Sequence, residues 1–446
     1  MNTNVSEPHA GGAAQSHASA EERIRTTRRF NIEDIELLAN AHRRFDCAPG
    51  TPWDNFRDSF LVLPCWFRFD LDPMSAHYAQ QQHRLWNIVA GQQRAYHPLT
   101  DEQTSMPDVD AIRFPAYFQR RGPEAIQRAS DHILATGMLL KHAGVRPGEW
   151  ALEYGAGFAQ TALHFARLGV NVDTVDISEE FCRHVKTQAD FYQVSLTPFC
   201  GSFGWNPRGA RKYDLIWFYE SFHHCLDFKN AVLALKRDLA PCGRVLLAGE
   251  PISRRENPNL PYPWGLRLGS DNIAVVRCRH WFELGFSEDF LVSLLTSAGF
   301  VGERMECAAS NWAQGYIFRH RGPRIHLAKH WLPTVEDETW HRHEKEGRWT
   351  RESSCLSLDT TDSFTALEIE ATNHHPVVQS LRLQYGSVSA DETFGAGERR
   401  TVRIGAATKN GKLVFRSRAL VPARDYEGQT PDARALGIFV HEVRYV

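Results

Sequence analysis

The sequence predicts an α/β fold: a doubly wound, mostly parallel sheet with a mostly helical N-terminal extension and a C-terminal all-β sandwich. Three observations lead to this prediction. Short apolar runs alternate with helical patterns over residues 123–322, which is typical of strands buried on both faces. A glycine-containing turn, Gly155 to Gly157, follows the first of these runs. Beyond residue 352 the apolar pattern takes a period of two, which favours a sandwich.

The composition narrows the classes of function. The chain has 446 residues, of which 42% are hydrophobic, so it can form two or three domains. Its net charge is -2, and the lack of a basic excess disfavours a nucleic-acid partner. No apolar run reaches the roughly 18 residues of a membrane span. The 9 cysteines form no Cys-x-x-Cys pair, which favours reduced thiols and a cytoplasmic location over disulfides or a structural zinc site.

The N-terminal third divides into two parts. Residues 1–30 are polar and lack an apolar core, so we expect a disordered leader rather than a secretory signal. Residues 31–122 are rich in aromatic side chains and predict a helical subdomain or lid. One helix within it is expected to begin at Asp72-Pro73 and to end at Gly91.

The C-terminal part is predicted to begin with a linker. Residues 323–352 are charged and rich in histidine and tryptophan, and we interpret them as a linker or an isolated helix. Their histidines have no acidic or cysteine partner at metal-ligand spacing, so solvated side chains are the favoured interpretation. Residues 353–446 predict the sandwich, with Asn410-Gly411 as the turn of a β-hairpin. The histidines in question are His326, His330, His341 and His343.

The turn after the first strand predicts a nucleotide site with an unusual charge. A dinucleotide fold requires a third glycine where this chain has Gln160. Glu153 would repel a pyrophosphate, whereas at about 4 Å it would stabilise a cationic ligand by several kcal/mol. S-adenosylmethionine carries an ammonium and a sulfonium. Asp176 follows about 20 residues later, where an acid accepts from ribose hydroxyls. A tight turn without a ligand is the alternative for Gly155 and Gly157.

Five segments in order resemble the class I S-adenosylmethionine-dependent methyltransferases. They are "LEYGAGFA", "TVDIS", "FCGSFG", "YDLIWFYESFHH" and "LAPCGRVLLAGEP". The resemblance covers roughly 200 residues. Ala159 and Cys242 stand where many members have glycine. The resemblance implies a Rossmann-like seven-stranded sheet with S-adenosylmethionine as cofactor. The implied cofactor residues are Glu153, Gly155, Ala156, Gly157, Asp176, Ile177, Ser202 and Phe203.

The end of the fourth strand holds the candidate catalytic residues. We expect His224, His223 or Glu220 to remove a proton from an acceptor hydroxyl, with His224 slightly favoured. A structural role for either histidine is the alternative. Together with Glu250, these residues also suggest a divalent metal site, but the chain has no compact acid-rich motif and we expect no metal.

Acceptor recognition is expected on the loops that follow the fifth strand. We select Glu250, Trp264, Trp281 and Glu283 as acceptor contacts, with packing under a lid as the alternative for the last three.

The predicted function is a cytoplasmic methyltransferase that O-methylates a saccharide or a glycan precursor. The C-terminal "PDARALGIFVHEVRYV" resembles modules attached to bacterial glycosyltransferases and methyltransferases of surface-polysaccharide pathways. The predicted β-sandwich domain, residues 353–446, has three candidate roles: binding a glycan, forming a homodimer, or bracing the catalytic domain. The alternative functions are methylation of a small natural product and a cofactor-binding interaction module without turnover.

Overall fold

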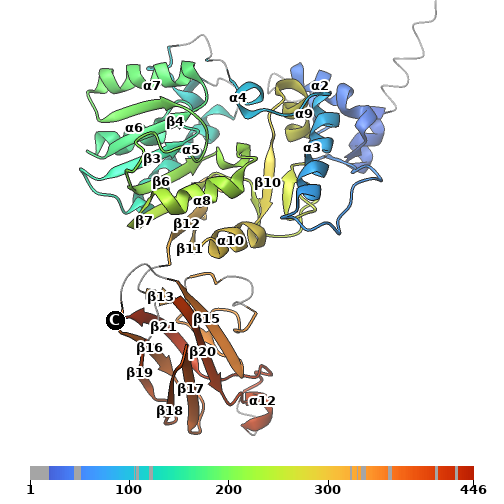
Figure 1. The fold of residues 1–446 in the computed structure, drawn as a ribbon. Helices are drawn as coiled ribbons and strands as arrows, with labels where there is room; N and C mark the ends of the chain where they lie inside the picture. Colours follow the sequence, from blue (N-terminus) through green and yellow to red (C-terminus); the bar gives the residue numbers. More distant parts are fainter. Residues whose placement is uncertain are drawn as a thin grey trace, which may run out of the picture.

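The structure is a computed structural model with two bodies, a large α/β body and a β-sandwich (Figure 1). The first 19 residues of the expected leader lie outside the described part of the chain. The described residues are 20–44, 52–104, 106, 110–119, 124–321, 324–328, 330–332, 338–359, 364–406, 410–426 and 430–446.

The α/β body is built on the predicted seven-stranded sheet. The strand order is β11-β12-β7-β6-β3-β4-β5, and β12 alone runs against its neighbours in this sheet. The order reverses beside β3, which places the ends of β3 and β6 at a switch point where ligands bind. The strands are β3 (Trp150–Tyr154), β4 (Asn171–Asp176), β5 (Leu196–Cys200), β6 (Tyr213–Tyr219), β7 (Leu239–Ala248), β11 (Phe300–Met305) and β12 (Gly315–His320).

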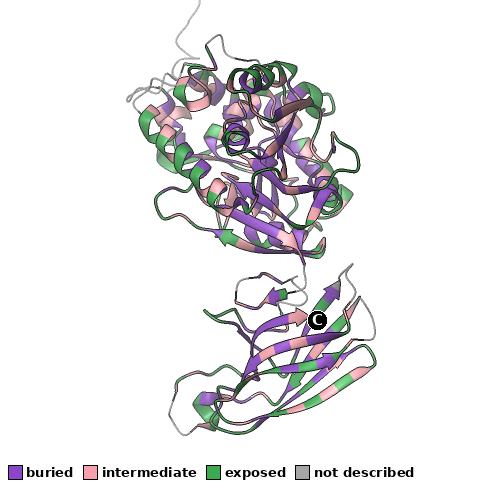
Figure 2. Cartoon of the chain, turned by 90° about the vertical axis from the view of Figure 1, so that its left-hand side faces the viewer, coloured by how far each residue is buried: buried purple, intermediate pink, exposed green. Residues whose placement is uncertain are grey.

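Helices bury both faces of this sheet, which explains its continuous apolar strands. In β6, Leu215 and Trp217 belong to the core with α5, α6 and α7, whereas Ile216 and Phe218 belong to the core with α8 and α10. Buried residues fill the strands in Figure 2. The helices are α5 (Ala125–Ala143), α6 (Gln160–Arg167), α7 (Glu179–Tyr192), α8 (Phe228–Asp238) and α10 (Glu288–Ser297).

The N-terminal extension is mostly helical, and two predictions about it need correction. Residues 20–27 of the expected leader are helical, and Ile24 and Phe30 are fully buried, because they belong to the main core. The predicted helix begins after Ser75, whose hydroxyl accepts the Tyr78 N–H at 3.2 Å, and not at Asp72. The elements are β1 (Arg29–Phe30), η1 (Ile32–Asp34), α2 (Ile35–Arg43), η2 (Pro52–Asn55), β2 (Phe60–Leu61), α3 (Ala76–Ala90), α4 (Pro98–Asp101) and η3 (Ala116–Gln119).

A segment inserted between β7 and α10 packs on this extension. It forms a three-stranded sheet, β8-β10-β9, and helix α9, which packs on α2 and α3. The Tyr78 hydroxyl of α3 donates to the carbonyl of Trp264 in β9 at 2.5 Å. The extension and the insertion therefore form one cap beside the main sheet (Figure 1). The inserted elements are β8 (Ile252–Ser253), β9 (Trp264–Leu266), α9 (Ser270–Arg279) and β10 (Leu284–Ser287).

The C-terminal body is a sandwich of two antiparallel sheets around one core. One sheet has the order β13-β21-β16-β19, with β14 also paired to β21, and the other has the order β15-β20-β17-β18. The strands are β13 (Arg324–His326), β14 (Arg348–Trp349), β15 (Ser353–Asp359), β16 (Ala366–Thr372), β17 (Gln379–Tyr385), β18 (Val388–Phe394), β19 (Arg399–Gly405), β20 (Asn410–Ser417) and β21 (Phe439–Tyr445), and α12 (Pro422–Asp425) is a short helix.

Three predictions about this body need correction: the linker, the solvated state of two histidines, and the hairpin. Residues 323–352 are not a separate linker or an isolated helix, because their strands β13 and β14 pair with β21 and Trp340 is buried. The histidines His330 and His341 are buried as well. Asn410-Gly411 does not turn a hairpin, because β19 and β20 belong to opposite sheets whose apolar faces share one core.

No helix in the described residues is both long and apolar enough to cross a membrane.

Candidate active site

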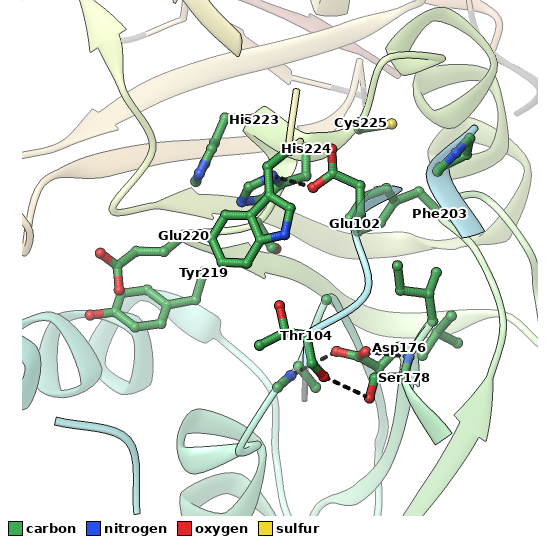
Figure 3. A pocket seen from close by; sticks show the side chains of 18 of the residues that line it. Glu102, Thr104, Asp176, Ser178, Phe203, Tyr219, Glu220, His223, His224 and Cys225 are labelled. Atoms are coloured by element: carbon green, nitrogen blue, oxygen red, sulfur yellow. Dashed lines mark hydrogen bonds and ion pairs between the residues drawn. The ribbon is translucent and has the colours of Figure 1, made fainter. Parts of the chain in front are cut away.

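A cavity of about 1190 Å³ lies at the carboxyl ends of β3, β4 and β6 (Figure 3). The main sheet supplies one wall, and the cap supplies the other. All eight residues selected for the cofactor line it, as do the three selected catalytic residues. The cap contributes His83, Tyr96, Glu102, Thr104, Tyr117, Trp264, Trp281 and Glu283, among others.

The turn between β3 and α6 leaves space in this cavity. Gly155 has a φ of 66°, and a Cβ atom there would lie 2.6 Å from the Cβ atom of Ser221. A Cβ atom on Gly157, where φ is 50°, would meet nothing within 4 Å. Ala159 has a φ of 50° although it is not glycine, which explains why many class I relatives have glycine there. Gly155 thus permits close packing, and Gly157 faces open space.

Asp176 closes the turn from the end of β4. Its Oδ2 atom accepts the Gly157 N–H, and its Oδ1 atom accepts the Ser178 N–H, each at 2.8 Å. Burial raises the pKa of the Asp176 carboxyl, although these N–H groups act in the opposite direction. Each carboxylate oxygen has a second lone pair, so Asp176 can still accept from a ligand hydroxyl.

Glu153 lies beneath the turn and not at the open mouth of the crevice, which corrects the position expected from sequence. Its side chain is buried, and Oε1 accepts the indole N–H of Trp217 at 2.8 Å and the hydroxyl of Thr161. Among the described residues, none donates a well-formed hydrogen bond to Oε2. Burial raises the pKa of Glu153 to about 8, against the effect of both donors. Without a nearby cation, this carboxyl is therefore mostly protonated at pH 7.

Glu220 follows β6 with a left-handed backbone. Its φ is 51°, a conformation that costs a non-glycine residue roughly 1–3 kcal/mol and is often found at functional sites. The Tyr117 hydroxyl donates to Oε2 of Glu220 at 2.8 Å. Figure 3 shows the Glu220 side chain beside that of Tyr219 at the edge of the cavity.

His223 and His224 lie in the short helix η4 (Phe222–His224), each beside a buried carboxyl group. His223 Nδ1 lies 2.9 Å from Glu250 Oε2, and His224 Nδ1 lies 3.0 Å from Glu102 Oε2. Burial and the charge of His224 hold the pKa of His223 well below its ordinary value. Burial would also lower the pKa of His224, but the carboxylates of Glu102 and Glu283 raise it to about 9. His224 thus holds a proton at neutral pH, unlike the free base expected from sequence.

The residues selected for the acceptor have different surroundings. Glu250 is not presented to the main cavity, because it accepts the backbone N–H groups of three successive residues, Ser221 to His223, besides contacting the His223 ring. Trp264 is almost fully buried and donates to the Pro73 carbonyl at 2.7 Å, although it lines the cavity. Trp281 lies edge-on to the His224 ring, with centroids 5.5 Å apart.

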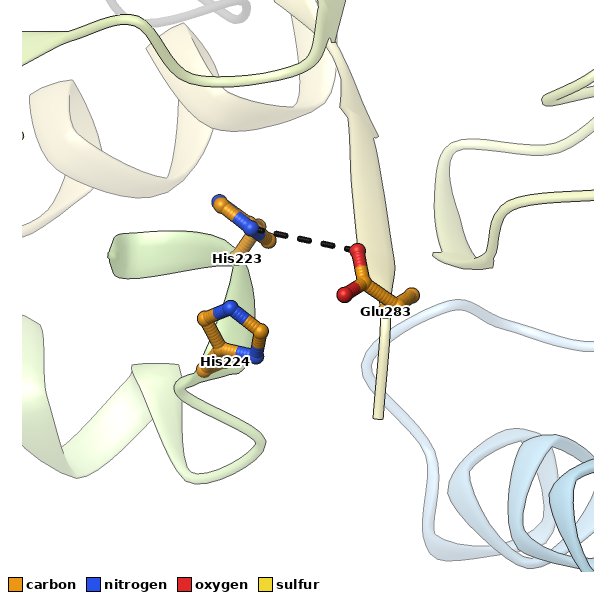
Figure 4. A group of neighbouring side chains, drawn as sticks. All are labelled: His223, His224 and Glu283. Atoms are coloured by element: carbon orange, nitrogen blue, oxygen red, sulfur yellow. Dashed lines mark ion pairs between the residues drawn. The ribbon is translucent and has the colours of Figure 1, made fainter. Parts of the chain in front are cut away.

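Glu283 joins the histidines in a compact group. Its Oε2 atom contacts the Arg267 guanidinium and lies 3.9 Å from His223 Nε2. One ligand atom each from His223, His224 and Glu283 lies within 4.8 Å of the others (Figure 4). This set differs from the metal alternative considered from sequence, where Glu220 and Glu250 stood in place of Glu283.

Sequence reasoning missed Glu102 and Tyr117, which reach the site from the N-terminal extension. Oε1 of Glu102 accepts from the Tyr96 hydroxyl at 2.7 Å and from the Phe282 N–H at 2.6 Å. These contacts span up to 180 residues of chain, and no local motif marks either residue. The only signal was the aromatic-rich segment interpreted as a lid.

A second cavity of about 620 Å³ adjoins the first, and Glu220 and His223 line both. Its wall is rich in carboxamides: Asn257, Asn259, Asn272, Asn311 and Gln314.

Comparison with known proteins agrees with this arrangement. Residues 152–247 match the family model described as a methyltransferase domain. No curated protein matches the chain.

The solved structures that match part of this chain include methyltransferases. An S-adenosylmethionine-dependent methyltransferase from Aquifex aeolicus is 16% identical, with 45% of this chain and 98% of that chain covered and a TM-score of 0.32. The 1,6-didemethyltoxoflavin-N1-methyltransferase of Burkholderia thailandensis, solved with S-adenosylhomocysteine, is 16% identical, with 49% and 93% covered and a TM-score of 0.32.

Proposed function

We propose that this chain, in which residues 152–247 form a methyltransferase domain that uses S-adenosylmethionine, transfers the methyl group to a hydroxyl of a saccharide or a glycan precursor. One observation carries the proposal. The cavity beside the Gly155–Gly157 turn adjoins a second cavity lined by carboxamides, and Glu220 and His223 line both. A cofactor in the first cavity and an acceptor in the second would therefore meet at these side chains.

The cofactor occupies the first cavity in this proposal. Its methionine part lies over the open space at Gly157, and Asp176 accepts from its ribose hydroxyls. Glu153 lies below and balances the positive charge of the ammonium and sulfonium groups. Ile177, Ser202 and Phe203 line the part of the cavity that the adenine would fill.

Glu220 acts as the general base. The acceptor oxygen forms a bond to the methyl carbon while the carbon–sulfur bond breaks, which leaves S-adenosylhomocysteine. The hydroxyl proton moves to the Glu220 carboxylate. The strained backbone of Glu220 and the hydrogen bond from Tyr117 hold this side chain where both cavities meet.

The carboxamides of the second cavity support a saccharide as acceptor. A sugar hydroxyl is both a donor and an acceptor, and an asparagine or glutamine side chain offers both partners. Several such groups in the lining suit a polyhydroxylated ring better than a flat phenol, which would need an apolar slot. We also place this activity in the cytoplasm, because the described cysteines are all free thiols.

The test uses S-adenosylmethionine with a tritiated methyl group and three acceptor sets: nucleotide sugars and oligosaccharides, phenolic metabolites, and peptides. We expect label in the saccharide set. Glu220→Gln should lower turnover roughly 10²–10⁴-fold, as loss of a general base does. Its affinity for S-adenosylhomocysteine should stay within about twofold of the wild type.

The matched control is Glu149→Gln, at the opposite end of β3 from the cavity. Label in the phenolic or peptide set alone would reject the saccharide. Binding of the cofactor with no transfer to any set would indicate an interaction module instead.

A further inference from the structure

The histidines beside Glu220 form a group whose geometry is that of a metal site (Figure 4). His223 and His224 follow β6, and Glu283 immediately precedes β10 of the cap. Two ligands bound at 2.0–2.1 Å to a tetrahedral ion lie about 3.4 Å apart. His223 Nε2 and Glu283 Oε2 are 3.9 Å apart, and the ligand atoms of all three residues lie within 4.8 Å of one another, so movements of up to about 1.4 Å would close the site.

Each histidine has a buried carboxyl group beside Nδ1. Glu250 Oε2 forms a hydrogen bond with Nδ1 of His223, and Glu102 Oε2 forms an ion pair with Nδ1 of His224 that lacks hydrogen-bond geometry. Among the described residues, Nε2 of neither ring makes a hydrogen bond. A carboxylate on one ring nitrogen fixes the tautomer and leaves the other nitrogen to bind an ion.

The two supporting carboxyl groups are themselves fixed. Glu250 accepts three backbone N–H groups, and Glu102 bridges the Tyr96 hydroxyl and the Phe282 N–H. Their side chains are 2% and 7% exposed, so neither pairing is a flexible surface contact. The arrangement is therefore built into the fold.

Acidic side chains outnumber basic ones around the group formed by His223, His224 and Glu283, which favours a cation. Three buried carboxyl groups, those of Glu102, Glu250 and Glu283, surround the rings. The positive charges beside them are the Arg267 guanidinium, which pairs with Glu283, and the proton on His224, which a bound ion would displace. Arg267 contacts Oε2, and a carboxylate has further lone pairs, so Glu283 can bind an ion while it keeps this partner.

We propose that His223, His224 and Glu283 bind a divalent transition-metal ion of the zinc type. Two imidazoles and one carboxylate are a donor set that zinc and its neighbours prefer, whereas magnesium and calcium prefer oxygen ligands alone. Three protein ligands leave a fourth position open to a small molecule. His223 lines the second cavity as well as the main one, so that position can face an acceptor bound there.

The role of the ion rests on the proposed function. A bound ion polarises an acceptor hydroxyl and eases loss of its proton to Glu220, which lies a few residues before the ligands. His223, His224 and Glu283 are then ligands, and Glu102 and Glu250 are positioning residues.

The experiment measures metal binding without cofactor or acceptor, so its outcome does not depend on the proposed function. The full-length protein is stripped with a chelator, incubated with Zn²⁺, dialysed and analysed for metal. We expect about one ion per chain. Co²⁺ should give the visible absorption bands of a site with nitrogen and oxygen ligands. His223→Ala and Glu283→Gln should each lose the bound ion, and Glu102→Gln should bind it roughly 10–100-fold more weakly.

His132→Ala is the matched control, because His132 lines the same cavity but contacts Tyr219 and not this group. It should keep the ion. Circular dichroism and S-adenosylhomocysteine binding verify that each variant is folded. No ion in the folded wild type, or an equal content in wild type and His223→Ala, would overturn the proposal.

Discussion

Glu153 should release a proton when S-adenosylmethionine binds. Burial raises the pKa of this carboxyl to about 8, so about 0.9 of the sites are protonated at pH 7 before binding. Ionising it at pH 7 costs about 1.4 kcal/mol. Attraction between the ionised Glu153 carboxylate and a ligand cation about 4 Å away would stabilise the complex by about 4 kcal/mol at an effective dielectric of 20. After the cost of ionisation, the binding free energy is more favourable by about 2.6 kcal/mol, which corresponds to roughly 80-fold in affinity.

Titration calorimetry at pH 7 in phosphate and in Tris tests this reasoning, because the two buffers take up protons with different heats. The wild type should release close to one proton more than Glu153→Gln, and the variant should bind roughly 80-fold more weakly. Glu149→Gln, at the other end of the strand, should behave as the wild type. Equal heats in both buffers for the wild type, or near-equal affinities of wild type and Glu153→Gln, would refute a charged role for this residue.

Three further predictions concern the turn and its acid. The folded protein holds the Glu153 proton more tightly than the unfolded chain, so this residue lowers the free energy of unfolding as the pH rises from 4.5 towards about 8. In denaturant unfolding, the free energy of unfolding of Glu153→Gln should exceed that of the wild type by up to about 4 kcal/mol at pH 8. At pH 4 the two values should differ little. Ala159→Gly should raise the free energy of unfolding by roughly 0.5–1 kcal/mol, because it relieves a left-handed residue, and an unchanged or lower value contradicts this. Gly155→Ala should lower the melting temperature markedly, because its Cβ atom collides with Ser221. Gly157→Ala carries only the cost of its left-handed backbone, so it should lower the melting temperature less and mainly abolish S-adenosylhomocysteine binding. Similar melting temperatures and affinities for the two variants would show that the turn does not make this distinction.

The parts of the fold that were predicted correctly are those with local causes. The strand around Leu215 to Phe218 is apolar on both faces, and helices cover both faces. Ser178 caps α7 by accepting the Phe181 N–H, and such an N-cap depends only on the next few residues. The glycine turn and the acid at the end of β4 have a fixed spacing in the chain, and the Gly157 N–H donates to Asp176.

The parts that were missed depend on contacts between distant segments. Glu102 and Tyr117 reach the site only because the N-terminal extension folds over the sheet. The hairpin predicted at Asn410 does not form, because the two flanking strands, β19 and β20, pair with distant segments in different sheets. The protonation of His224 depends on Glu102, so a pKa inferred from residue type alone was misleading.

The matched span 152–247 does not contain every residue of the candidate site. Of the three carboxyl groups around the histidine pair, Glu102 precedes the matched span 152–247, and Glu250 and Glu283 follow it. A fragment trimmed to that span would keep the glycine turn and lose every one of them. Chimeras that exchange only this module between relatives should therefore transfer cofactor use without transferring the choice of acceptor.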